Sequence, residues 1–563
     1  MKKTGGKAVA EALRDEGVNH VFGLIGSAGM ELFDALYDEP SIRFIGVRDE
    51  RTGTHMADGY ARASGRAGVV VAGQNGPGAT NLVTGLAQAN AAYSPVVALA
   101  GSLSSAHVYR DAFQEVDQQA LFQPITKKTW TVTQAKRIPE FVNQAFRTAL
   151  APRCGPVALN LPRDLLAESV ECEPVPMRSR PDISGACAPS GPRIDAIAAL
   201  LRNAQRPVIL AGGGVKNGRS YRQVIRLAEQ LGAPIATSPG HGDAIPCDHP
   251  LYAGQVGPRG NAVATRLMLE ADVILALGTR LGFNTTFYTN DYLSASASIV
   301  QVEIESTAIG RFFPVKYGVV ADAGEFANSL HAAIGEHDFA SIASWTNAFK
   351  SERATFTSER EKTSLASAEL IQPGRLFRAI REVAPLEAMY TLDAGTLCLQ
   401  ATDALNYFKP PALFSPLDFG LVGFSYACGL GAQLACPDRK VISLMGDGGF
   451  GMTSSEIGTA VANNISSVCI VMNNGCWGAE KAYQRDFFDG RYLGADITNP
   501  PYDKLAELWG ARGFKVESAD QLERVLDEAI QCGQHAIVDV AIDPNALYSF
   551  RRDAFKHRNL LTK

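Results

Sequence analysis

Short runs of apolar residues recur along the whole chain, and several of them end in glycine. They occupy residues 67–73, 94–101, 206–214, 271–278, 439–449 and 466–474. Their interiors do not alternate with polar residues, so both faces of each predicted strand must be covered. Helical stretches lie between the runs, as in sheets whose parallel strands are joined by helical crossovers. The pattern predicts an α/β fold of doubly wound, mainly parallel sheets.

The chain of 563 residues is longer than a single hydrophobic core can serve, which predicts three domains. Residues 170–193 are rich in Pro, Ser and Arg, and the polar stretch 342–374 ends in Pro-Gly, so both are interpreted as connections. We therefore expect domains at 1–175, 190–340 and 370–563. The first and last of these are similar in length and in their glycine-rich strand ends.

The composition excludes several classes of protein. A net charge of −5 argues against general nucleic-acid binding, and no apolar run reaches the roughly 18 residues of a membrane span. Ten cysteines without a C-x-x-C pair make a disulfide framework or a zinc site unlikely, which favours a reduced, cytoplasmic location. Residues 1–20 predict an amphipathic helix and not a signal peptide.

Two strand ends carry residues that suit a metal ion and an anion. The run 444–452, "LMGDGGFGM", ends in glycines around Asp447, and the run 472–481, "MNNGCWGAEK", contains Asn474. The two polar residues are 27 positions apart, which is the length of one strand–helix–strand crossover, so both strand ends are expected side by side. A helix is expected to begin near 453–456. A lone G-D-G is usually a tight turn, but with N-N at this spacing the pattern favours Mg²⁺ against a diphosphate.

These two motifs resemble the thiamine diphosphate motif, which opens with GDG and closes with NN. The stretches 46–65, 73–89, 113–127 and 420–435 are similar to acetolactate-synthase-like enzymes, so the resemblance covers the whole chain. It implies an N-terminal pyrimidine-binding domain, a central nucleotide-fold-like domain and a C-terminal diphosphate-binding domain.

The resemblance also implies roles for individual residues. Glu50 would bond a ring nitrogen of the aminopyrimidine, and Gln114 would share in catalysis; the alternative for Glu50 is a surface carboxylate paired with Arg48 or Arg51. The Mg²⁺ ligands would be Asp447, Asn474 and the backbone carbonyl of Cys476. Further cofactor contacts would be Gly395, Thr396, Leu397, Gly420, Val422, Gly448, Gly449, Trp477 and Gly478. Each site would lie between two subunits of a homodimer or homotetramer.

Within this superfamily the chain is most similar to the sulfoacetaldehyde acetyltransferases, through residues 22–30, 72–81, 113–122, 477–481 and 550–558. Such an enzyme converts sulfoacetaldehyde and phosphate to acetyl phosphate and sulfite. Sulfonate and phosphate groups need cations, and Arg forks suit tetrahedral oxyanions. The candidates are Lys481, Arg485, Arg551 and Arg552, with a solvated basic tail as the alternative for the last two.

Other functions stay open on the sequence. An acetolactate-synthase-like carboligase or decarboxylase, or a 2-hydroxyacyl-CoA lyase, would share the same motifs. A non-catalytic homologue is disfavoured, since Glu50, Asp447 and Asn474 are all present. In the central third, Gly212, Gly213 and Gly214 follow a strand as in a nucleotide-binding turn. The resemblance implies that FAD is absent there, with an adenine nucleotide as the alternative.

Overall fold

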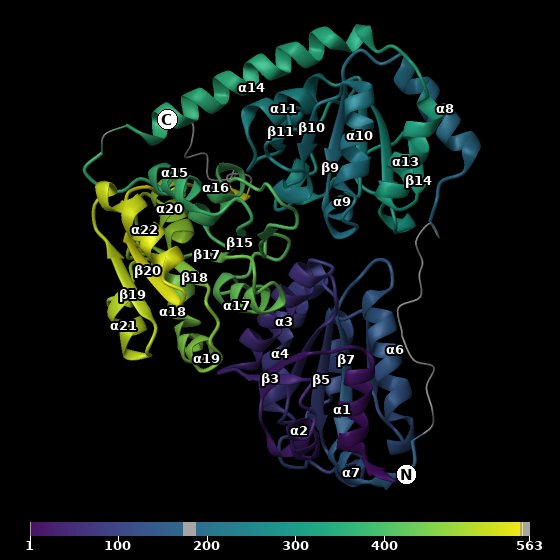
Figure 1. Ribbon diagram of the computed structural model, residues 1–563, viewed down its shortest axis with the longest axis vertical. Helices are drawn as coiled ribbons and strands as arrows, with labels where there is room; N and C mark the ends of the chain where they lie inside the picture. The colour runs from purple at the N-terminus through teal and green to yellow at the C-terminus, as the bar shows by residue number, and fades with distance from the viewer. Residues whose placement is uncertain (1, 173–186, 367, 552–553, 556–563) are drawn as a thin grey trace.

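The computed structural model describes residues 2–172, 187–366, 368–551 and 554–555. Three six-stranded sheets, in each of which every neighbouring pair of strands is parallel, carry helices around them. Each sheet forms its own body in Figure 1: N-terminal in purple and blue, central in teal, C-terminal in green and yellow. The prediction of doubly wound α/β domains is confirmed. Among the described helices, none has the length and apolar content needed to cross a bilayer.

The N-terminal sheet has the strand order β3-β2-β4-β5-β7-β6. Its strands are β2 (His20–Leu24), β3 (Arg43–Gly46), β4 (Gly68–Ala72), β5 (Val96–Ser102), β6 (Lys128–Thr131) and β7 (Val157–Pro162). The main helices around it are α1 (Gly5–Asp15), α2 (Met30–Tyr37), α3 (Glu50–Ser64), α4 (Pro77–Ala91) and α6 (Ile138–Leu150). The predicted amphipathic helix at the start of the chain is α1, whose buried face includes Val9 and Leu13.

The C-terminal sheet repeats this arrangement, with the order β16-β15-β17-β18-β20-β19. Its strands are β15 (Met389–Leu392), β16 (Leu413–Phe414), β17 (Val441–Gly446), β18 (Val468–Asn473), β19 (Arg512–Val516) and β20 (Ala536–Ala541). Its helices include α15 (Pro373–Val383), α16 (Thr396–Ala404), α17 (Ser425–Ala435), α18 (Asp447–Gly451), α19 (Ile457–Ala462), α20 (Gly478–Phe487), α21 (Tyr502–Leu508) and α22 (Leu522–Gln531). Numbered within each domain, the two sheets have the same strand order, as their similar strand ends suggested.

The central sheet has a different order, β11-β10-β9-β12-β13-β14, in which the first strand lies in the middle. Its strands are β9 (Pro207–Ala211), β10 (Ile235–Thr237), β11 (Tyr252–Gln255), β12 (Val273–Leu277), β13 (Ser298–Glu303) and β14 (Tyr317–Val320). The helices around it include α8 (Gly191–Arg202), α10 (Tyr221–Leu231), α11 (Ala262–Glu270) and α13 (Ala323–Ile334).

The second predicted connection, 342–374, is mostly a helix, α14 (Ala343–Ser364), which runs from the central body toward the C-terminal one in Figure 1. Its first half is held by the buried side chains of Trp345 and Phe349. Near its other end, Arg360 donates to the Asp403 carbonyl oxygen at 2.9 Å. Two aromatic anchors at one end and an arginine near the other hold the helix, so the sequence shows no long apolar stripe. Residues 173–186 of the first connection lie outside the described part.

Helices α3 and α17 join the N-terminal and C-terminal domains at a backbone-to-backbone crossing. A Cβ on Gly59 would lie 2.0 Å from the Cys428 carbonyl oxygen, and a Cβ on Gly431 would lie 1.9 Å from the Met56 carbonyl oxygen. Nearby, the Arg48 backbone N–H donates to Glu456 Oε1 at 2.9 Å. These contacts fix the two similar domains against each other within one chain.

The strand ends that the sequence singled out are neighbours. Strands β17 and β18 pair in parallel, with Gly446 opposite Met472. The helix expected to begin near 453–456 is present, because the 3₁₀ turn Ser454–Glu456 leads directly into α19. A further short helix, α18, precedes it and starts at Asp447 directly after β17, where a carboxylate in the first turn is favourable at a helix N-terminus.

Candidate active site

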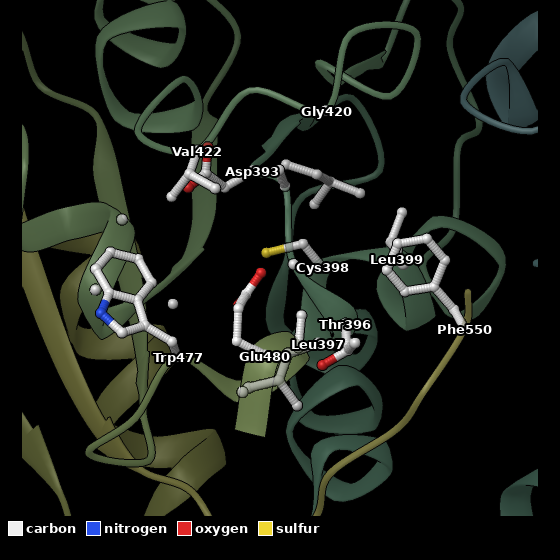
Figure 2. Close-up of a pocket in the computed structure, with 18 of the residues that line it drawn as sticks. Asp393, Thr396, Leu397, Cys398, Leu399, Gly420, Val422, Trp477, Glu480 and Phe550 are labelled. Atoms are coloured by element: carbon white, nitrogen blue, oxygen red, sulfur yellow. The ribbon is translucent and has the colours of Figure 1, made fainter. Parts of the chain in front are cut away.

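A cavity of about 200 Å³ lies at the carboxyl ends of β15, β17 and β18, where open α/β sheets bind ligands. Three turns of the C-terminal domain form most of its wall, Arg259 comes from the central domain, and Phe550 comes from the C-terminal segment. The lining includes Asp393, Gly395, Thr396, Leu397, Cys398, Leu399, Gly420, Val422, Asp447, Gly448, Gly449, Asn474, Cys476, Trp477, Gly478, Glu480, Tyr483, Arg259 and Phe550. Figure 2 shows Trp477 and Phe550 on opposite sides of this space, with Glu480 between them.

Three polar groups converge at the ends of β17 and β18. One atom of the Asn474 side-chain amide lies 3.2 Å from Asp447 Oδ1 and 3.2 Å from the Cys476 carbonyl oxygen. With its nitrogen there the amide donates to both groups; with its oxygen there, three oxygens face one another and require a cation. Adjacent ligands of an octahedral Mg²⁺ lie about 3.0 Å apart, because each is about 2.1 Å from the ion. The donor set therefore fits Mg²⁺.

The other contacts of Asp447 orient it toward this point. Asn499 Nδ2 donates to Asp447 Oδ2 at 2.7 Å, and the Tyr502 hydroxyl lies 2.8 Å from Asn499 Oδ1 and 3.0 Å from the Asp447 carbonyl oxygen. Burial raises the pKa of Asp447, and the bond from Asn499 opposes that shift. In the described chain no three His, Cys, Asp or Glu side chains cluster as metal ligands, so a metal here depends on the amide and carbonyl oxygens.

Glycines keep the other walls close and free of side chains. Gly395 precedes α16 with a φ of +124°, and nothing lies within 4 Å of a Cβ placed on it. Thr396 and Leu397 follow it in the first turn, where backbone N–H groups favour an anion. A Cβ on Gly448 would meet the Trp477 ring at 2.6 Å, and one on Gly449 would lie 2.3 Å from an Asp393 oxygen. The turns thus leave room for a diphosphate group.

Asp393 is a site residue that the sequence reasoning missed. Its buried carboxylate accepts backbone N–H groups of Gly423, Phe424 and Ser425 at 2.7–3.2 Å, which fixes the start of α17. Burial raises the pKa of Asp393 to about 6 against the effect of these donors. Beside it, Val422 Cγ1 would lie 3.3 Å from a Cβ on Gly449. The sequence signal that could have indicated Asp393 is its position directly after the apolar strand β15.

Glu50 and Gln114 each contact the same turn of the N-terminal domain, at residues 74–78. Gln114 bonds this turn through Gln74 and through Asn75, whose Nδ2 donates to the Gln114 carbonyl oxygen at 3.0 Å. Glu50 is buried; Asn81 Nδ2 donates to its Oε2 at 3.0 Å, and burial raises its pKa. The interpretation of Glu50 as a surface carboxylate is therefore wrong. Neither Glu50 nor Gln114 lines the cavity in the same chain.

Of the four cations predicted for substrate, the three that the structure describes do not line this cavity. Lys481 Nζ pairs with Asp496 at 2.5 Å, and Arg485 Nε pairs with Asp486 at 2.7 Å. Arg551 lies over the Phe283 ring at 4.9 Å, in the lining of a neighbouring cavity. Arg552 lies outside the described residues. Instead, Arg259 of the central domain reaches the cavity wall, which no local motif had indicated.

The neighbouring cavity, of about 1240 Å³, lies between the central domain and the other two. The glycine turn singled out in the central third contributes Gly213 and Gly214 to its wall. The two cavities share Arg259, Leu417, Gly420 and Phe550. The absence of FAD from this space stays a prediction, which the visible absorbance of the purified protein would check.

Three family models match the chain in order. They are the thiamine pyrophosphate enzyme N-terminal TPP binding domain at residues 3–121, the central domain at 194–330 and the C-terminal TPP binding domain at 393–540. Sulfoacetaldehyde acetyltransferases of Alcaligenes xylosoxydans xylosoxydans and Castellaniella defragrans are 35% and 34% identical over 98% of this chain, and over 95% and 96% of their own. A probable acetolactate synthase large subunit of Methanocaldococcus jannaschii is 33% identical over 96% of this chain and 92% of its own.

Proposed function

The chain belongs to the thiamine diphosphate enzymes, and from that premise we propose that it is an acyltransferase that converts sulfoacetaldehyde and phosphate to sulfite and acetyl phosphate. The observation that supports this choice most is the similarity to sulfoacetaldehyde acetyltransferases along nearly the whole chain. A localisation in the cytoplasm is part of the same proposal.

In this proposal Asp447, Asn474 and the Cys476 carbonyl oxygen hold Mg²⁺. The convergence of their polar atoms within 3.2 Å supports the assignment. The glycine turns at 395–397 and 448–449 and the first turn of α20 at 477–478 receive the diphosphate, where backbone N–H groups are free of side-chain cover. Gly420 and Val422 face the same space from the loop before α17.

Thiamine diphosphate bound here would supply a carbon nucleophile for the aldehyde carbon and an electron sink for the electron pair later released at that carbon. The contribution of Glu50 is to hold a proton beside a ring nitrogen of the cofactor. Its raised pKa favours the protonated carboxyl, and the bond from Asn81 fixes the orientation of Oε2. Gln114 supports the same turn from its other side. This is general acid–base assistance by a positioned group.

The site is proposed to lie between two copies of the chain. Glu50 does not line the cavity that contains Asp447 in its own chain, which supports a partner's contribution. The loop around Gln114 exposes Tyr109 and Phe113 almost fully, at 93% and 84%, as a surface that another subunit would cover. The assembly is a homodimer or a homotetramer built from such dimers.

Mixing two inactive variants tests this arrangement. Glu50→Gln and Asp447→Asn chains, unfolded and refolded together, would form hybrids with one intact site each. The mixture should then recover about a quarter of the wild-type activity, because half the dimers are hybrids with one of two sites restored. Each variant refolded alone is the control. A mixture as inactive as its components would show that the site lies within one chain.

The reaction itself is tested with purified protein, thiamine diphosphate, Mg²⁺, sulfoacetaldehyde and phosphate. Sulfite and acetyl phosphate should appear in equal amounts, and a chelator of Mg²⁺ should stop both. The second candidate is acetolactate synthesis from pyruvate, favoured by the relatives of that name. Acetolactate formation without sulfite release would replace the first proposal by the second.

A further inference from the structure

Arg259 is the single cationic side chain among the described residues that line the cavity. The other charged members of the lining are Asp393, Asp447 and Glu480. Asp393 is engaged by three backbone N–H groups, and Asp447 lies at the proposed metal site. An anionic molecule that enters this cavity therefore finds one fixed positive side chain, that of Arg259.

The contacts that hold Arg259 include two from different parts of the chain. It lies in the loop between β11 and α11 of the central domain, and its Nη1 donates to Asn284 Oδ1 at 2.9 Å. Its guanidinium lies over the Phe550 ring, 4.4 Å from the centroid. Stacking on an aromatic face leaves the edge of the guanidinium plane available for hydrogen bonds.

The position of Arg259 separates it from the metal. Arg259 and Phe550 belong to the wall that the two cavities share, whereas Asp447, Asn474 and Trp477 line only the first. Figure 2 places Phe550 across the cavity from Trp477, whose ring packs on Gly448 beside the metal residues. Arg259 thus lies on the side from which a second molecule would enter, away from the diphosphate turns.

We propose that Arg259, supported by Phe550 and Asn284, binds the anionic head group of the donor substrate. In the proposed function that group is a sulfonate, so its identity rests on that function. A guanidinium offers parallel N–H donors to two oxygens of a sulfonate, which also orients the aldehyde end. Glu480, between Trp477 and Phe550 in Figure 2, disfavours a second anion at the centre of the cavity.

Binding of ethanesulfonate to the holoprotein, with thiamine diphosphate and Mg²⁺ present, tests the proposal by calorimetry without turnover. Arg259→Gln should weaken ethanesulfonate binding roughly ten- to hundredfold, the loss expected for hydrogen bonds to a charged group. Arg259→Lys should retain part of the affinity. Arg311→Gln is the matched control, because Arg311 also stacks on a phenylalanine, Phe312, but lines only the larger cavity.

The affinity for thiamine diphosphate should be the same in all four proteins, and the KM for sulfoacetaldehyde should rise in Arg259→Gln. Unchanged ethanesulfonate affinity in Arg259→Gln, or no binding to the wild type, would overturn the proposal. A loss of affinity only for thiamine diphosphate, or only for inorganic phosphate, would also overturn it, because Arg259 would then bind the cofactor or the acceptor. Failure of the proposed function is seen separately, as absence of sulfite release by the wild type.

Discussion

Asn499 should control the affinity for Mg²⁺ although it does not reach the proposed metal position. Its Nδ2 donates to Asp447 Oδ2 at 2.7 Å, which leaves Oδ1 facing Asn474 and the Cys476 carbonyl. Asn499→Leu keeps the branched shape of the side chain and removes this donor. The freed carboxylate can then rotate, and its raised pKa rises further because the opposing hydrogen bond is gone.

The magnitude follows from the kind of bond that is lost. A hydrogen bond to a charged group contributes about 1.5–3 kcal/mol, which corresponds to roughly ten- to hundredfold in affinity. Groups that orient a metal ligand have effects in the same range, about 10- to 100-fold. Tyr502→Phe removes neutral hydrogen bonds to Asn499 and to the Asp447 carbonyl oxygen, so a smaller change of at most about tenfold is expected.

The assay is a Mg²⁺ titration at saturating thiamine diphosphate, followed by tryptophan fluorescence, since Trp477 lines the cavity. The midpoint for Asn499→Leu should shift to higher Mg²⁺ concentration, with Tyr502→Phe between it and the wild type. Thermal unfolding of the metal-free proteins checks that the fold is intact. A midpoint for Asn499→Leu within about twofold of the wild type would refute the reasoning, because it lies below the smallest expected loss.

Three further changes have defined outcomes. Glu50→Gln should reduce kcat by roughly 10²–10⁴-fold with little effect on cofactor affinity, and full activity would exclude its role as a proton donor. Burial raises the pKa of Glu50, so ionisation of this carboxyl destabilises the folded wild type. The stability of Glu50→Gln relative to wild type should therefore increase as pH rises from acidic to neutral. A stability difference that does not change with pH in cofactor-free thermal melts would contradict this. Gly449→Ala places a methyl group 2.3 Å from the Asp393 carboxylate, so cofactor binding measured by calorimetry should be lost or strongly weakened. Trp345→Ala should lower the stability of the central domain by about 3–5 kcal/mol in thermal unfolding, since the ring is buried and anchors α14; a change below about 1 kcal/mol would contradict that role.

The parts of the site that could be predicted from the sequence lie on single strand ends. Asp447 and Asn474 follow apolar strands at crossover spacing, and the parallel pairing of β17 with β18 brings them together. Arg259 and Phe550 could not be found in this way. Their positions depend on how the central domain and the C-terminal segment pack against a distant sheet, and neither residue belongs to a local pattern that records this contact.

The same distinction applies to the fold. The apolar runs predicted the parallel sheets, because a short, continuously apolar run that ends in glycine is typical of a strand covered on both faces. The helix α14 was missed, since its anchors are two aromatic residues at one end and an arginine near the other rather than a periodic stripe. The short helix α18 was missed because the glycines of "GDGGFG" signal a turn more strongly than a helix.

The crossing of α3 with α17 limits how this chain can change over generations of mutation. At Gly59 and at Gly431 the obstacle to a larger residue is the main chain of the opposing helix, which no exchange of side chains can move. A random library selected for heat tolerance should therefore keep glycine at both places, even where neighbouring positions vary, and compensating pairs should not arise between them.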